Sequence, residues 1–131
     1  MAEFNLPIGV KNTIEITVSS NDTAAKYGSG LIEVFATPAM VGLMENTAQS
    51  SVGKLLPEGF ITLGTEINVQ HLKATPVGMK VKCESVLIKS DNKKLSFEVT
   101  AWDEQAIIGK GTHERYIVEA KKFMEKLNSQ K

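Results

Sequence analysis

Several features that mark other classes of protein are scarce or absent in this chain of 131 residues. Its single cysteine, Cys83, excludes an internal disulfide and a cysteine-rich metal site and suits a reducing compartment, so we expect the cytoplasm. Fifteen basic residues balance fifteen acidic ones, so the overall basic field that favours nucleic acid is missing. The sequence has no apolar run of about 18 residues and no apparent secretion signal. We therefore expect a soluble protein that binds neither nucleic acid nor a membrane.

Length and composition favour a single folded domain over residues 1–131. Hydrophobic residues make up 42% of the chain and charged residues 23%, which is ordinary for a globular protein. The four prolines are scattered, and no repeat, low-complexity tract or linker divides the sequence. One hydrophobic core is sufficient for a chain of this size.

A long helix is predicted near the middle of the chain, over residues 38–55. Apolar side chains recur there at helical spacing, Thr37 is a permitted N-cap, and Pro38 suits the first helical position. Glu45 is the only charged residue between Thr37 and Lys54. Because the segment is so apolar, it predicts a central helix with most of its circumference buried.

The rest of the regular structure is predicted to be mainly strands. Residues 13–19 alternate between polar and apolar side chains, and further strand-like runs cover 61–63, 67–71, 79–83, 95–101 and 107–118. Short polar connections between the later runs predict an antiparallel meander, and residues 119–131 favour a charged helix. We therefore predict an α+β fold in which a sheet wraps one helix. An uncovered sheet edge would favour pairing with a second copy.

Two residues of the predicted helix have chemical potential. Glu45 either faces solvent at a gap in the core or is held with partners as a general base or nucleophile. Thr37 is either a plain N-cap or lies where the helix dipole stabilises a carbonyl oxygen that gains negative charge. Their separation of eight residues corresponds to about 12 Å along a helix axis. They can therefore line one cavity without touching each other.

The two histidines are predicted to point inward from strands. His71 continues an alternating apolar pattern and is either a structural histidine or a proton donor near a reacting carbonyl. Alternation also places His113 on the same face as Arg115. Spacing does not support a metal site made from the histidines and Glu45, and we expect neither a metal nor another cofactor.

Other short motifs favour structural interpretations. Gly109-Lys110-Gly111 lies within a strand-like run and not before a helix, so it predicts a β-bulge or a close backbone approach rather than a nucleotide-binding loop. Cys83 lies in an alternating strand and is predicted to be a buried, inert thiol. The nucleophile-elbow motif of serine hydrolases is missing, so any hydrolysis uses another design.

Three separated blocks of the sequence match one known family in their order and spacing. They are Val34-Phe35-Ala36-Thr37 with Met40-Val41-Gly42-Leu43-Met44-Glu45, then Leu63-Gly64-Thr65 with His71 and Ala74-Thr75-Pro76, then Gly109 with Gly111-Thr112-His113-Glu114-Arg115. On these residues the chain resembles the hotdog-fold thioesterases, and among them the fluoroacetyl-CoA thioesterase group. The resemblance implies a long helix wrapped by an antiparallel sheet, a homodimer, and an acyl-CoA thioester as substrate.

The resemblance also implies roles for individual residues. Thr37, Glu45 and His71 match the catalytic residues, and Gly64 and Arg115 match positions that line the acyl pocket. Glu45 would attack the thioester or deprotonate a water, and these alternatives stay open. Thr37 would position the reactants, and His71 would hydrogen-bond the reacting group.

The segment before the helix departs from the fluoroacetyl enzyme. Leu31 stands where that enzyme has a gating phenylalanine, and Pro38-Ala39 and Asn46-Thr47 replace bulkier residues. We take Leu31 and Phe35 as substrate-pocket residues and expect a short acyl chain other than fluoroacetyl. The predicted function is thus hydrolysis of a short-chain acyl-CoA to the free acid and CoA. The alternatives are another acyl-thioester enzyme such as a dehydratase, a carrier-protein substrate in place of CoA, and a non-catalytic dimeric hotdog protein that only binds acyl thioesters.

Overall fold

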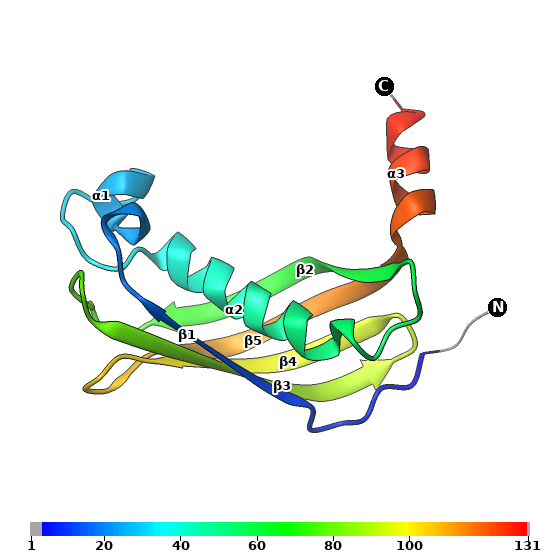
Figure 1. Ribbon diagram of the computed structural model, residues 1–131, viewed down its shortest axis with the longest axis horizontal. Coiled ribbons are helices and arrows are strands. Elements are labelled where there is room, and N and C mark those ends of the chain that lie inside the picture. The colour runs from blue at the N-terminus through cyan, green and yellow to red at the C-terminus, as the bar shows by residue number, and fades with distance from the viewer. Residues whose placement is uncertain (1–3, 131) are drawn as a thin grey trace.

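A curved antiparallel sheet of five strands wraps one long helix (Figure 1). The computed structural model describes residues 4–130. In chain order the elements are β1 (Lys11–Thr17), η1 (Ser20–Asp22), α1 (Ala24–Tyr27), α2 (Thr37–Gly53), β2 (Phe60–His71), β3 (Lys80–Asp91), β4 (Lys94–Trp102), β5 (Ile107–Glu119) and α3 (Ala120–Asn128). The predicted α+β layout is confirmed.

The strands lie in the order β1-β3-β4-β5-β2, and every neighbouring pair is antiparallel. Strands β3, β4 and β5 form the predicted meander. The two short runs predicted at 61–63 and 67–71 belong to one strand, β2, whose register shifts between Gly64 and Glu66. Within the described part of the chain, β2 pairs with β5 along one side only, so its other side is an edge of the sheet.

Helix α2 packs one side against the sheet. Its buried residues are Met40, Leu43, Met44, Thr47, Ala48 and Val52. Gly42, Asn46 and Gln49 are exposed on the opposite side. The prediction that most of the helix circumference is buried is therefore wrong for the single chain, because the sheet covers only one side of α2.

The first turn of α2 differs from the prediction in one informative way. The helix begins at Thr37 and ends at Gly53, and its N-cap is Ala36, which makes no side-chain capping bond. The prediction of Thr37 as N-cap is wrong, because Thr37 already has helical geometry and its hydroxyl bonds elsewhere. Pro38 is the second helical residue and not the first as predicted, but it still lies in the first turn, where a missing N–H costs no helical hydrogen bond.

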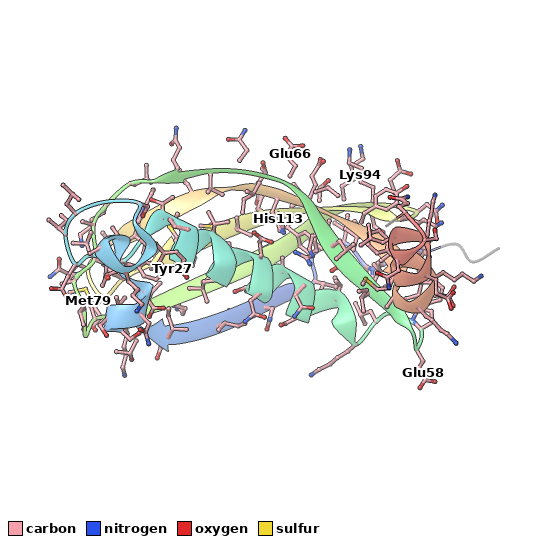
Figure 2. All side chains as sticks on the ribbon, turned by 90° about the horizontal axis from the view of Figure 1, so that it is seen from above. Tyr27, Glu58, Glu66, Met79, Lys94 and His113 are labelled. Atoms are coloured by element: carbon pink, nitrogen blue, oxygen red, sulfur yellow. The ribbon has the colours of Figure 1, made fainter. Side chains whose placement is uncertain are left out.

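The segment before α2 is tied to the segment after β2. Residues 20–22 and 24–27 form the short helices η1 and α1, whose N-caps are Ser19 and Thr23. The Phe35 N–H then donates to the carbonyl oxygen of Thr75 at 2.8 Å. This hydrogen bond joins the start of α2 to the end of β2, at the end of the molecule that Figure 2 marks with Tyr27 and Met79.

The glycines of β5 allow close packing, as the sequence predicts. A Cβ at Gly109 would overlap the thioether of Met40, and one at Gly111 would overlap the carbonyl oxygen of Asn68. Cys83 is fully buried, and burial raises the pKa of its thiol to about 11, consistent with the predicted inert role. Helix α3 extends from the end of β5 away from the sheet (Figure 1). None of the helices within residues 4–130 is long and apolar enough to cross a membrane.

Candidate active site

A threonine and a histidine meet where α2 begins and β2 ends. The Thr37 Oγ1 lies 2.8 Å from the Nδ1 of His71, a hydrogen-bond distance. His71 is on the helix-facing side of the sheet, as the alternation predicts, because its register partner Gly109 lies under Met40 of α2. The hydroxyl that the sequence assigned to capping therefore binds an imidazole.

A cavity of about 420 Å³ adjoins this pair. Its lining residues are Ala24, Ser29, Val34, Phe35, Thr37, His71, Leu72, Lys73 and Ala74. The buried ring of Phe35 stands edge-on to the His71 ring, with 6.4 Å between the ring centroids. Phe35, predicted as a substrate-pocket residue, thus lines the cavity beside Thr37 and His71.

The imidazole of His71 is suited to a neutral role. Burial lowers its pKa below the ordinary histidine value, and a backbone hydrogen bond at Lys73 partly opposes this shift. Its Nε2 is buried and has no hydrogen-bond partner among the described residues. Because buried polar atoms normally have partners, an unpaired nitrogen beside a cavity suggests a position for a substrate atom.

A second group of polar residues surrounds Gly64. The buried guanidinium of Arg115 donates from Nε to Thr62 Oγ1 at 2.7 Å and from Nη2 to the Thr62 carbonyl oxygen at 2.9 Å. Its Nη1 lies 3.9 Å from the Oε1 of Glu45, whose side chain is 42% exposed. A Cβ added to Gly64 would come within 3.1 Å of the same Glu45 oxygen and 3.3 Å of Arg115 Nη1. The predicted residues Glu45, Gly64 and Arg115 therefore form one cluster.

His113 fixes the geometry of this cluster. Its Nδ1 lies 2.7 Å from the carbonyl oxygen of Glu66 and therefore donates, which leaves Nε2 to accept from Arg115 Nη1 at 3.1 Å. Burial lowers the pKa of His113, and the nearby Arg115 charge lowers it further. Burial also lowers the pKa of Arg115, while Glu45 opposes that shift. Figure 2 labels His113 and Glu66.

Sequence reasoning placed His113 on the face of Arg115 but gave it no role. The hydrogen bonds show that it orients the guanidinium, together with Thr62, which the sequence did not single out. The alternation of residues along β5 indicates that His113 and Arg115 point to the same side of the sheet. Nothing local marks Thr62, because its contact with Arg115 joins residues 53 positions apart.

The single chain does not bring all predicted residues together. Among the described residues, Glu45 forms its ion pair with Arg115, whereas Thr37 pairs with His71. The separation of eight residues along α2 keeps the two groups about 12 Å apart along the helix axis. Leu31 is 97% exposed and does not line the cavity. Its predicted role in the substrate pocket stays a prediction.

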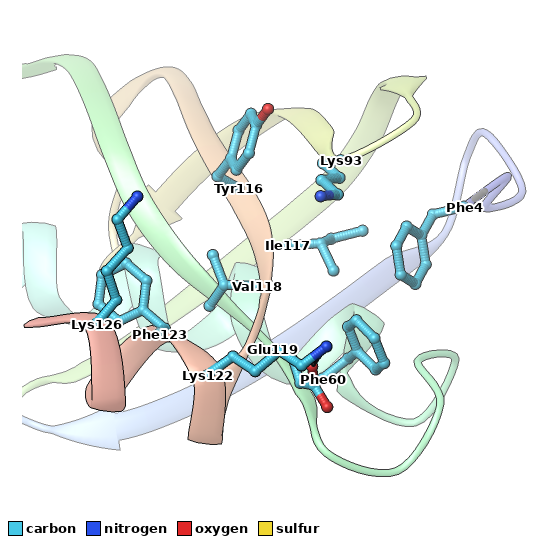
Figure 3. A pocket seen from close by; sticks show the side chains of 10 residues that line it. All are labelled: Phe4, Phe60, Lys93, Tyr116, Ile117, Val118, Glu119, Lys122, Phe123 and Lys126. Atoms are coloured by element: carbon cyan, nitrogen blue, oxygen red, sulfur yellow. Dashed lines mark ion pairs between the residues drawn. The ribbon is translucent and has the colours of Figure 1, made fainter. Parts of the chain in front are cut away.

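Another cavity, of about 450 Å³, lies at the opposite end of the sheet beside α3 (Figure 3). Three of its lining residues are Phe4, Phe60 and Phe123. Its carboxylate, Glu119, pairs with Lys122 at 3.4 Å. None of the residues predicted for catalysis, Thr37, Glu45 and His71, lines this cavity, so it is not the candidate site. Within residues 4–130, no three His, Cys, Asp or Glu side chains are grouped for a metal ion.

Comparison with known proteins places this geometry in a family. The family model of the fluoroacetyl-CoA-specific thioesterase FlK matches residues 18–121. The chain belongs to this family. The fluoroacetyl-CoA thioesterase of Streptantibioticus cattleyicolor is 42% identical over 95 residues, which make up 72% of this chain and 68% of that protein. The chain is therefore a thioester hydrolase related to the fluoroacetyl-CoA thioesterases.

Solved structures of the family agree with the fold described above. One FlK structure superposes with a TM-score of 0.91 at 34% identity and covers 98% of this chain and 99% of that chain. An FlK variant solved with fluoroacetate and CoA superposes with a TM-score of 0.85 at 35% identity, over 90% of this chain and 99% of that one. The predicted hotdog fold and family are confirmed.

Proposed function

We propose that this protein hydrolyses short-chain acyl-CoA thioesters to the free acid and CoA, and that Thr37, His71 and Glu45 are its catalytic residues. The observation that carries the proposal is the 2.8 Å contact between Thr37 Oγ1 and His71 Nδ1 beside a cavity, in a member of a thioesterase family. Variants of FlK have been solved with acetyl-CoA and with fluoroacetate and CoA, which supports CoA as the carrier.

The chemistry follows from what a thioester requires. A thiol with a pKa near 8.5 leaves as a thiolate without a strong acid, so the enzyme must activate the carbonyl and the attacking group. If the Thr37 hydroxyl donates to Nδ1, neutral His71 carries its proton on Nε2, the atom that has no hydrogen-bond partner within residues 4–130. That N–H would donate to the carbonyl oxygen as negative charge develops there.

Glu45 would supply or activate the attacking group. Its carboxylate either attacks the carbonyl carbon, which forms a mixed anhydride that water hydrolyses, or it takes a proton from a water that attacks directly. In both routes a C–O bond forms, the C–S bond breaks, and the thiolate leaves. Arg115, 3.9 Å away and anchored by Thr62, would orient the carboxylate.

The surroundings of Gly64 support a short acyl group. A single Cβ there would lie 3.1 to 3.3 Å from Glu45, His113 and Arg115. Because even one added carbon is tightly enclosed, this end of the acyl pocket would accept only a few carbon atoms. Leu31, smaller than the phenylalanine expected at its position, would relax the selection for the fluorinated substrate.

Two copies of the chain would assemble the complete site. The free edge of β2 can pair with a second β2; His71 is the last residue of this strand, and Gly64 lies nearer its beginning. Antiparallel pairing of two β2 edges would bring the His71 end of one copy towards the Gly64 half of the other. The Thr37 and His71 of one copy would then face the Glu45 of its partner, which is why we infer a homodimer.

Subunit complementation tests the shared site. Glu45→Gln and Thr37→Val homodimers should each be inactive, but each mixed dimer has one site with both native residues. Random remixing should therefore restore about a quarter of wild-type activity, because half of the dimers are mixed and each has one working site. Absence of recovery after verified remixing, with both variants dimeric, would refute a site shared between copies.

The substrate is tested with a panel of acyl-CoAs from acetyl to medium chain, with fluoroacetyl-CoA and an aromatic ester included. Release of free thiol is followed for the wild type and for Glu45→Gln, with Gln49→Glu as a control substitution on the exposed side of α2. We expect turnover of a short ester that Glu45→Gln abolishes and the control retains. Tight binding of the esters without turnover would instead favour a non-catalytic acyl-thioester-binding protein.

A further inference from the structure

A buried carboxylate outside the predicted site contacts the segment that follows His71. Asp103 lies just after β4, and its side chain is completely inaccessible to solvent. Its Oδ1 accepts from the N–H groups of Gln105 and Ala106 at 2.8 and 2.9 Å, which closes the turn to β5. Its Oδ2 accepts from Lys73 Nζ at 2.5 Å and Thr75 Oγ1 at 3.0 Å.

The two oxygens of Asp103 thus serve different elements. One holds its own turn, and the other holds residues 73–75, which follow His71 directly. The same segment is held from the other side, because the Thr75 carbonyl oxygen accepts from the N–H of Phe35, two residues before Thr37. Asp103, Thr75 and Phe35 therefore link the β4–β5 turn to both halves of the Thr37–His71 contact.

The chemistry of Asp103 favours a rigid link. Burial alone would raise its pKa, but the hydrogen bonds from Lys73, the two turn amides and Thr75 hold the pKa far below the ordinary range. Hydrogen bonds from four donors to a charged carboxylate are strong and directional. Removal of one hydrogen-bond partner from such a buried charge lowers the stability of the fold markedly. Both N–H groups of the turn donate to Oδ1. The turn therefore does not require Oδ2, which is left to hold Lys73 and Thr75.

We propose that Asp103 is a positioning residue for the reaction, whose carboxylate fixes the segment after β2 and thereby holds His71 in register with Thr37. The inference rests on the proposed function. Asp103 acts through Lys73 and Thr75 and does not touch the reacting atoms.

The direct test is Asp103→Asn, which keeps the side-chain shape and one acceptor for the turn but turns an amide N–H₂ toward Lys73 and Thr75. A small displacement of a catalytic group lowers turnover by about ten to a hundredfold. We expect that loss in kcat with little change in KM. Glu104→Gln is the matched control, since Glu104 lies in the same turn but accepts from the Lys80 N–H. It should retain wild-type kcat.

A second readout does not depend on turnover. The chain has only two histidines, so the ¹⁵N signals of both imidazoles can be resolved. In Asp103→Asn the tautomer signature of His71 should change, while that of His113, held by Glu66 and Arg115, should not. Thr75→Val removes only one donor to Oδ2 and should show a smaller change of the His71 signal. This variant provides the test if Asp103→Asn fails to fold.

The outcomes separate the two proposals. A folded Asp103→Asn protein with wild-type kcat and an unchanged His71 signal would overturn the positioning role. An equal change at both histidines would also overturn it, because the carboxylate would then support the fold as a whole. If the wild type hydrolyses no ester but His71 alone changes, the proposed function fails while the structural link stands.

Discussion

Replacement of Thr37 by valine separates catalysis from helix stability. Valine keeps the branched shape but removes the hydroxyl that contacts His71 at 2.8 Å. A typical hydrogen bond contributes about 0.5 to 1.5 kcal/mol to folding, and Thr37 is exposed, so water can replace it. We therefore expect the free energy of unfolding to fall by less than about 1 kcal/mol. The N-cap is Ala36, so no capping bond is lost.

The effect of Thr37→Val on turnover should be far larger. Loss of a positioned group in proton transfer typically lowers kcat by about a hundredfold to a thousandfold, which corresponds to about 3 to 4 kcal/mol of transition-state stabilisation. The assay is initial thiol release from the best acyl-CoA of the panel, paired with urea denaturation of the same preparation. Thr37→Ser, which restores a hydroxyl, should recover most of the rate.

The opposite pattern would refute this reasoning. A helix-capping threonine would give a stability loss of about 0.5 to 2 kcal/mol when removed, with turnover per folded molecule unchanged. If Thr37→Val keeps at least half of the wild-type kcat, its hydroxyl has no part in the reaction. If serine fails to rescue a folded protein, the hydroxyl is not the group that matters.

Three further predictions concern buried groups. His113→Leu leaves the Glu66 carbonyl and an Arg115 N–H without partners, so urea denaturation should show a loss of about 2 to 5 kcal/mol; a loss below 1 kcal/mol would contradict this. The lowered pKa of His71 should place the acidic limb of the kcat/KM profile below the ordinary histidine value of about 6.5. Below that value the unfolded chain binds a proton at this histidine more readily than the folded chain does, so the free energy of unfolding should fall from pH 7 to pH 5. Cys83 should not react with a thiol reagent at pH 8 until denaturant is added, and a rapid stoichiometric reaction of the native protein would show that its thiol is accessible.

The fold was largely predictable from the sequence because its patterns are local. The alternation of β1 and the meander from β3 to β5, like the apolar run of α2, depend on neighbouring residues. The wrong predictions concern features that depend on tertiary contacts. The capping role of Thr37 was wrong because His71, 34 residues away, binds its hydroxyl. The exposed side of α2 was missed because hydropathy does not reveal how much of a helix one sheet can cover.

The candidate site was predictable in part. Glu45 stood out as a lone charge in an apolar helix, and alternation placed His71 and Arg115 on the inward face. The spacing separated Thr37 from Glu45, but it did not reveal that His71 contacts Thr37 and that Arg115 contacts Glu45. Asp103 and Thr62 gave no local signal at all, because each acts through contacts with residues distant in the sequence.

The glycine opposite His71 has a consequence for protein design. Met40 lies one helical turn beyond Thr37, and its thioether occupies the space that a side chain at Gly109 would need. A methyl group at this position would therefore displace the Sδ and Cε atoms of Met40 from the sheet beneath the start of α2. A graft of the three proposed catalytic residues onto another sheet-and-helix scaffold should carry this pairing of glycine and methionine with it, because the packing beneath Thr37 depends on both.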